Sequence, residues 1–204
     1  MANNFFSFSK RRFSAMPKLA STFRASDLTV HPVDVKKIKP MAHGQFGFGR
    51  QFTDHMLTID WSKEGGWEAP KIIPHGPLDL ETSATSLHYG ISCYEGISVC
   101  KNSQTGKLQG FRVNDHMNSL LNSTAHLDMP AFDANELVDC LKPLIKLDRD
   151  WIDHYDEPDQ FYTRLLHIST DKTLGVRTPQ FTKLVAFLNP IQLPEKELAL
   201  KCSS

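Results

Sequence analysis

The sequence predicts an α+β fold, with a twisted, mainly antiparallel sheet flanked by two or three helices. Apolar and polar residues alternate with period two in 52–61 and 161–169, as they do in half-buried strands. Apolar residues instead recur at helical spacing in 114–124 and 133–145. A chain of 204 residues is long enough to bury one sizeable core, with part of a second.

The strand at 52–61 opens the predicted sheet, and a turn at 63–66 follows it. Residues 67–80 contain three prolines and are expected to run extended along the surface. Ser83 is expected to cap a short helix. Gly96 is expected to end that helix, because glycine readily adopts the left-handed conformation found at helix ends.

A β-hairpin is predicted in 97–113, around a turn at 102–106. Asn114 is the expected N-cap of the helix that follows. The predicted buried face of this helix holds Met117, Leu120, Leu121 and Thr124.

A second long helix is predicted to begin at Asp133, with Glu136 completing a capping box. Its predicted buried stripe holds Leu137, Val138, Leu141, Leu144 and Ile145. Pro143 lies inside this helix and predicts a kink. An acidic loop at 151–160 then leads to the strand at 161–169, and 184–188 forms a further short strand.

The composition argues against several classes of function. The net charge is zero, and the basic residues of the first 30 positions leave the remainder slightly acidic, so nucleic acid is a poor candidate partner. The four cysteines show no paired spacing, which argues against a disulfide scaffold and against a zinc site. No apolar run reaches the roughly 18 residues of a membrane-spanning helix, so none is expected.

Residues 1–26 are rich in Phe, Ser and Arg, and no acidic residue precedes Asp27. This composition is typical of a mitochondrial transit peptide and predicts a location in the mitochondrial matrix. The alternative is an inconsequential basic tail, with a cytoplasmic location. Residues 27–49, with two prolines and a basic cluster, are expected to form a linker.

Four motifs occur in order along most of the chain. They are Phe48-Gly49-Arg50-Gln51-Phe52-Thr53-Asp54-His55-Met56-Leu57, Leu87-His88-Tyr89 with Tyr94-Glu95-Gly96, Pro130-Ala131-Phe132-Asp133 with Glu136-Leu137, and Tyr162-Thr163-Arg164 with Leu174-Gly175-Val176. Together they resemble the motifs of the branched-chain amino acid aminotransferases, which are pyridoxal-phosphate enzymes of fold type IV. Their order and spacing match those of the family.

The resemblance implies a domain division and a reaction. Residues 50–176 would form the aminotransferase small domain, and residues 177–204 the start of a truncated large domain with a polar tail. The family exchanges an amino group between leucine, isoleucine or valine and 2-oxoglutarate, with pyridoxal phosphate as cofactor. The resemblance further implies a homodimer, or a subunit of a larger complex, that binds small amino and oxo acids.

The resemblance also implies site residues. Lys101 occupies the position of the family's phosphate-binding arginine, although lysine lacks the two-pronged geometry of arginine. The matching substrate-binding residues are Phe48, Tyr89, Tyr94, Tyr162, Arg164, Leu174 and Val176. Of these, Leu174 and Val176 match the loop that family members lend across the dimer interface.

The residues alone leave alternatives open. Strand alternation places Tyr162 and Arg164 on one face of the predicted sheet, where Arg164 would line a pocket or form a structural ion pair. Each aromatic residue also fits ordinary core packing, and Lys101 fits a surface position. His88 is expected to be a hydrogen-bonded structural histidine instead of a general base.

The sequence offers no catalytic residue and no metal site. The family's Schiff-base lysine lies well beyond the Leu174–Val176 loop, and none of Lys183, Lys196 and Lys201 has the sequence context of that lysine. The chain is therefore expected to be a truncated aminotransferase that is inactive alone. The alternative is a non-catalytic structural subunit of a larger mitochondrial assembly. Another fold type IV enzyme, such as a D-amino acid aminotransferase or a lyase, agrees less well with the motif at 52–57.

Overall fold

One mixed sheet organises the described part of the chain, which comprises residues 6–7, 22–35, 48–102, 104–153 and 160–191 of a computed structural model. The strand order is β1-β7-β6-β8-β9-β3-β5-β2, with β4 paired to β3. The strands are β1 (Phe6–Ser7), β2 (Thr29–Val30), β3 (His55–Ser62), β4 (Gly66–Trp67), β5 (Lys71–Pro74), β6 (Ser92–Lys101), β7 (Leu108–Gly110), β8 (Gln160–Ser169) and β9 (Phe181–Ile191). The helices are η1 (Ala25–Asp27), α1 (Thr85–Tyr89), α2 (Val113–His126), α3 (Ala134–Leu147) and α4 (Asp150–Asp153).

The sheet is mainly antiparallel, as the sequence predicts. Its long strands β6, β8, β9 and β3 are neighbours in that order, and each pairs antiparallel with the next. The two parallel pairs, β1–β7 and β2–β5, lie at the margins of the sheet. The predicted domain boundary at residue 177 falls between β8 and β9, which are adjacent strands of this one sheet.

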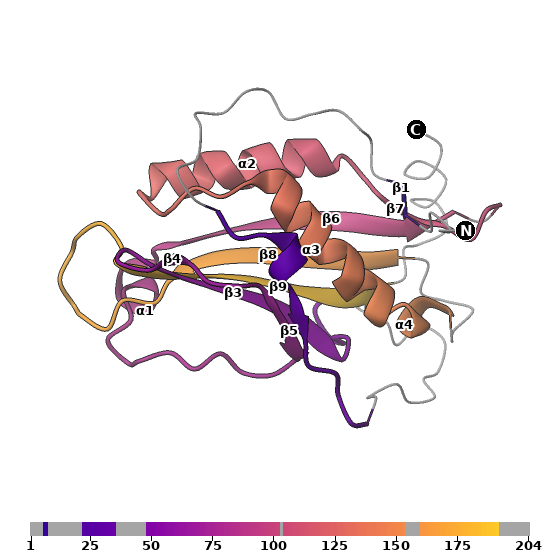
Figure 1. Cartoon of the computed structure of the whole chain (residues 1–204), viewed down its shortest axis with the longest axis horizontal. Helices are drawn as coiled ribbons and strands as arrows, with labels where there is room; N and C mark the ends of the chain where they lie inside the picture. Colours follow the sequence, from indigo (N-terminus) through magenta and orange to yellow (C-terminus); the bar gives the residue numbers. More distant parts are fainter. Residues whose placement is uncertain (1–5, 8–21, 36–47, 103, 154–159, 192–204) are drawn as a thin grey trace.

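The long helices cover one face of the sheet, as Figure 1 shows for α2 and α3. Along β8 the odd-numbered residues from Phe161 to His167 are buried on the helix side, where His167 meets Thr124 of α2. The even-numbered Tyr162, Arg164 and Leu166 are partly buried and point to the opposite side. We call this second side, away from α2 and α3, the far face.

The buried faces of α2 and α3 agree with the predicted ones. The predicted residues of α2 are buried, and so are those of α3. Asp133 is the N-cap of α3, because its side chain accepts a hydrogen bond from the Asn135 amide at 2.8 Å. Glu136 does not close a capping box; its carboxylate instead accepts from the Ala25 amide at 2.7 Å and so binds the N-terminal segment to α3. α3 continues through Pro143 as a single helix.

Three predicted helix ends were wrong. Gly90, with φ of 63°, ends α1 at Tyr89, whereas the predicted stop Gly96 lies inside β6. The reason is that β6 begins to pair with β8 at Ser92, which commits the following backbone to the sheet. At the helix starts, neither Ser83 nor Asn114 is a cap. The N-caps are Ala84 and Arg112, and neither makes a side-chain capping bond.

The segment after residue 21 is part of the fold. Phe23 is buried and packs against the rings of Trp67 and Phe132. β2 then adds to the sheet beside β5, within the stretch predicted as a linker. Most of the predicted transit peptide, at 1–5 and 8–21, lies outside the described residues, as does 36–47 of the linker.

The motif Thr53-Asp54-His55 attaches the end of α3 and the start of α4 to the sheet. His55 Nδ1 lies 2.6 Å from Asp148 Oδ1, and both side chains are buried. Trp151 Nε1 donates to Asp54 Oδ2 at 2.8 Å. The predicted loop at 151–160 thus begins as part of a helix, because the buried Trp151 needs a partner for its indole N–H.

Candidate functional site

The far face of β6 and β8 carries aromatic rings around one guanidinium group. Arg164 Cζ lies 4.2 Å from the centre of the Tyr94 ring and 5.6 Å from the centre of the Tyr162 ring. The Phe48 ring meets Tyr162 edge-on, with 4.9 Å between the ring centres. Four of the predicted substrate-binding residues therefore lie together. We call Phe48, Tyr94, Tyr162 and Arg164 the Arg164 cluster.

Strand register explains this arrangement. Gly96 of β6 is paired with Arg164 of β8, and Tyr94 with Leu166, so Tyr94 is the diagonal neighbour of Arg164. A Cβ atom at position 96 would overlap the Tyr162 hydroxyl oxygen. The side chain of Tyr162 therefore lies across Gly96, and glycine is required there for close approach.

Within the described residues, Arg164 forms no ion pair with a carboxylate. The alternative prediction for Arg164, a structural ion pair, therefore has no support from this part of the chain. A partly buried guanidinium held over aromatic faces keeps its N–H groups available to an anion, because cation–π contact uses the plane of the group and leaves the edge free. The Arg164 cluster is suited to bind a carboxylate next to an apolar group.

Tyr89 and Leu174 form a second pair. The Tyr89 hydroxyl donates to the Leu174 carbonyl at 2.5 Å. The side chains of Leu174 and Val176 are exposed, by 56% and 79%. In the described residues, no hydrogen bond, ring contact or ion pair connects them to the Arg164 cluster. Seven predicted substrate-binding residues therefore divide into a group of four and a group of three.

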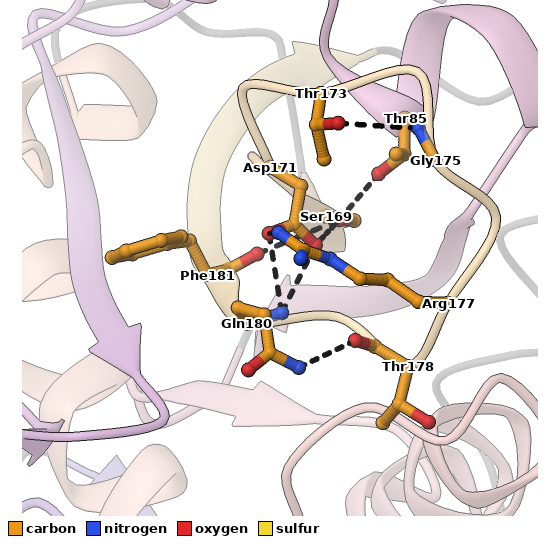
Figure 2. A network of polar contacts seen from close by, with 9 residues as sticks. All are labelled: Thr85, Ser169, Asp171, Thr173, Gly175, Arg177, Thr178, Gln180 and Phe181. Carbon is orange, nitrogen blue, oxygen red and sulfur yellow. Dashed lines mark hydrogen bonds and ion pairs between the residues drawn. The ribbon is translucent and has the colours of Figure 1, made fainter.

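Asp171 holds the base of the loop that carries Leu174 and Val176, as Figure 2 shows. Its buried carboxylate accepts from the Gln180 amide, at 3.0 Å and 3.2 Å from its two oxygens, and from the Ser169 hydroxyl at 3.3 Å. Arg177 lies 3.9 Å from it. No sequence pattern pointed to Asp171, because an acidic residue in a loop is usually solvated.

Lys101 lies apart from the Arg164 cluster. It is seven residues along β6 from Tyr94, an odd spacing that places its side chain on the helix-covered face. Its ammonium group lies 2.7 Å from Asp153, which Arg149 also contacts at 2.6 Å. Burial opposes ionisation of Asp153, but the hydrogen bonds from Lys101 and Arg149 lower its pKa.

Lys183 and His88, which the sequence raised as candidates for catalysis, can also be located. Lys183 of β9 forms an ion pair with Asp60 of β3, with 2.7 Å between nitrogen and oxygen. His88 bonds the carbonyl of Thr82 at 2.7 Å, as expected for a structural histidine. Lys196 and Lys201 lie outside the described residues.

Two polar residues adjoin members of the Arg164 cluster, Asn189 as the cross-strand partner of Tyr162 and Glu95 as the chain neighbour of Tyr94. Asn189 of β9 is buried and bonds the backbone beside Phe48, accepting from the Gly49 amide at 2.7 Å. Glu95, next to Tyr94, accepts from Ser119 and from His116 of α2. Burial opposes this charge, but these hydrogen bonds lower the pKa of Glu95. The usable signal for Asn189 was a single side-chain amide directly after the apolar run 184–188.

Curated proteins with similar sequences identify the family. The cytosolic branched-chain-amino-acid aminotransferase of Mus musculus is 36% identical over 174 residues, which make up 85% of this chain and 44% of the mouse protein. A probable branched-chain-amino-acid aminotransferase of Staphylococcus aureus (strain N315) is 38% identical over 72% of this chain and 40% of its own length. The chain is a member of the branched-chain-amino-acid aminotransferase family. It spans less than half the length of these relatives.

The fold agrees with this family. A solved branched-chain amino acid aminotransferase from Escherichia coli superposes with a TM-score of 0.52 at 23% identity, covering 67% of this chain and 41% of that one. No family model matches the chain. The four motifs thus belong to one α+β fold of the type IV aminotransferases.

Two further observations concern the described residues alone. No group of three or more His, Cys, Asp or Glu side chains in these ranges is placed to hold a metal ion. Of the helices described, none has the length and apolar character needed to cross a bilayer.

Proposed function

We propose that this chain supplies the carboxylate-binding part of a branched-chain aminotransferase site, for transfer of an amino group between leucine, isoleucine or valine and 2-oxoglutarate. The guanidinium of Arg164 would bind the carboxylate, and Tyr94, Tyr162 and Phe48 would pack against the aliphatic side chain. The observation that carries the proposal is a guanidinium between two tyrosine rings, with no carboxylate partner in the described residues.

Arginine is suited to this role for a geometric reason. Its planar guanidinium presents parallel N–H groups to both oxygens of a carboxylate, and ring contacts on its faces limit its rotation. The aromatic rings beside it displace part of the surrounding water, which strengthens the ion pair. The same rings favour a branched aliphatic group over a polar one.

Pyridoxal phosphate is the cofactor that the family implies, and the described residues do not complete a site for it. The cofactor needs a lysine for a covalent link and a cation for its phosphate. Lys183 is held by Asp60, and Lys101 is bound to Asp153 on the opposite face from Arg164.

The proposal extends to the assembly and the location of the protein. The exposed Leu174 and Val176 on a loop fixed at its base support a homodimer or a larger complex, in which a second protein would cover them. Relatives include cytosolic enzymes and bacterial ones. A mitochondrial location stays a prediction from residues 1–26, with the cytoplasm as the alternative.

The test is calorimetric titration of the purified chain with 4-methyl-2-oxopentanoate and with its uncharged methyl ester. The acid is expected to bind, and Arg164→Gln is expected to weaken binding about ten-fold or more, because a charge-assisted hydrogen bond contributes about 1.5–3 kcal/mol. Arg112→Gln, which removes the exposed arginine that precedes α2 and pairs with Asp115, is the matched control. Equal affinity for acid and ester, or an unaffected Arg164→Gln variant, would refute the proposal.

A further inference from the structure

Asn189 lies near the end of β9 and is 2% exposed. We propose that Asn189 is a positioning residue that fixes Phe48 against Tyr162, and so sets the size of the substrate side chain that the Arg164 cluster accepts. The inference rests on the proposed function, because it names the residue that tunes the specificity of that same site.

Both ends of the Asn189 amide are occupied by backbone groups. Its Oδ1 accepts from the Gly49 amide at 2.7 Å, and its Nδ2 donates to the carbonyls of Gln51 at 2.5 Å and Pro190 at 3.3 Å. The turn after Phe48 is therefore tied to β9 at two points. A carboxylate could accept from Gly49 but could not donate, and an apolar side chain could do neither.

The register of the sheet makes this attachment specific. Asn189 is the direct cross-strand partner of Tyr162, the residue whose ring Phe48 contacts. Gly49 has a φ of 70°, a conformation that favours glycine, and this turn directs Phe48 back over the sheet. The turn is thus anchored beside the ring that it must cover.

Packing alone holds Phe48 weakly. Its side chain is 63% exposed, and its ring contact in the described residues is with Tyr162. The position of the ring consequently depends on the turn that precedes Gln51, and the turn depends on Asn189. The ring of Phe48 covers part of Tyr162 and so extends the apolar wall of the site; without Phe48, this part of Tyr162 is open to water.

Selectivity between oxo acids follows from this wall. A branched side chain gains affinity from apolar contact with Phe48, whereas pyruvate has only a methyl group to offer. The presence of one or two extra methylene-sized groups in an apolar pocket changes affinity by about ten-fold or more. Loss of the wall should therefore weaken binding of the branched acid and leave that of pyruvate nearly unchanged.

The experiment compares dissociation constants for 4-methyl-2-oxopentanoate and pyruvate in Asn189→Asp, Phe48→Ala and the double variant. Asn189→Asp is expected to reduce the preference for the branched acid about ten-fold. Phe48→Ala should do the same, and Asn189→Asp should add no further loss to it. Asn122→Asp, on the exposed side of α2, is the control. An unchanged preference in Asn189→Asp, or additive losses in the double variant, would overturn the inference.

A second measurement needs no ligand and separates this inference from the proposed function. 4-Fluorophenylalanine at position 48 reports the ring current of Tyr162 by fluorine NMR, and circular dichroism verifies that each variant is folded. Asn189→Asp should move this resonance to its position in a Tyr162→Leu variant. An unmoved resonance overturns the role of Asn189. If the resonance moves but the wild-type chain binds neither oxo acid, the proposed function fails and only the positioning of Phe48 is supported.

Discussion

Arg164 is a charged residue on a sheet face, and the side chains around it determine which of its groups can bind a ligand. Tyr94 and Tyr162 contact it through their rings, which leaves its hydrogen-bonding edge available. Strand alternation in the sequence predicted that Tyr162 and Arg164 share a face. Sequence periodicity could not show that Gly96 and Asn189 support them, because those contacts are made between strands that are distant in the chain.

Gly96→Ala tests the close approach of Tyr162. The added methyl group would overlap the tyrosine hydroxyl, so the ring must move away from its place across β6. We expect a loss of about 1–3 kcal/mol in the free energy of unfolding, as for other overpacked sites, measured by urea denaturation. Gly76→Ala is the control, since nothing lies within 4 Å of its added Cβ. A variant as stable as the wild type would show that Tyr162 does not need this space.

Helices and strands differ in how much of them the sequence reveals. The buried faces of α2 and α3 were predictable, because a helix packed on a sheet needs apolar residues every three or four positions, and this pattern is visible within one short segment. Helix ends were less predictable, since several residues near each end could serve as caps. Because β6 pairs with β8 from Ser92 onward, α1 ends at Gly90 and not at Gly96. Glu136 accepts a hydrogen bond from the distant Ala25 amide instead of closing the predicted capping box.

The cap of α3 provides a test at this scale. Asp133→Ala removes the side-chain bond to the Asn135 amide and should lower the free energy of unfolding by about 1 kcal/mol. Ser83→Ala, at the predicted cap that α1 does not use, should change it by less than about 0.5 kcal/mol. Urea denaturation of both variants distinguishes the two positions. Equal losses would mean that the assignment of the caps is wrong.

The sheet as a whole brings the site together from separate parts of the chain. Phe48 precedes β3, Tyr94 lies in β6, and Arg164 in β8, while Asn189 comes from β9. The sequence indicated the strands but not their order, because pairing between distant strands leaves no local pattern. The resemblance to the family named Arg164 and three tyrosines, of which Tyr94 and Tyr162 contact the guanidinium, whereas Tyr89 bonds the Leu174 carbonyl. It also named Lys101, whose side chain is bound to Asp153 on the other face, and a role of Lys101 in binding a phosphate stays a prediction.

The stability of the whole molecule should depend on pH through His167. This imidazole lies in the core between Thr124 and Thr182, and burial lowers its pKa from 6.5 to about 3. Below pH 6.5 the unfolded chain therefore takes up a proton that the folded chain does not. The stabilisation that the neutral His167 contributes is fully present above its pKa in the unfolded chain. As the pH falls from there toward the pKa of His167 in the folded chain, the free energy of unfolding decreases by up to about 1.4 kcal/mol per pH unit.

Urea denaturation between pH 7 and pH 5 should show this slope, in a range where the carboxylates of the unfolded chain remain largely ionised. His167→Gln should be less stable at pH 7, because it disturbs a buried and hydrogen-bonded side chain, but its stability should fall less steeply with acid. His31→Gln, at an exposed position, is the matched control and should keep the wild-type slope. If His167→Gln retains the full slope, the acid sensitivity of the fold arises elsewhere, and the core accommodates a protonated imidazole that burial should exclude.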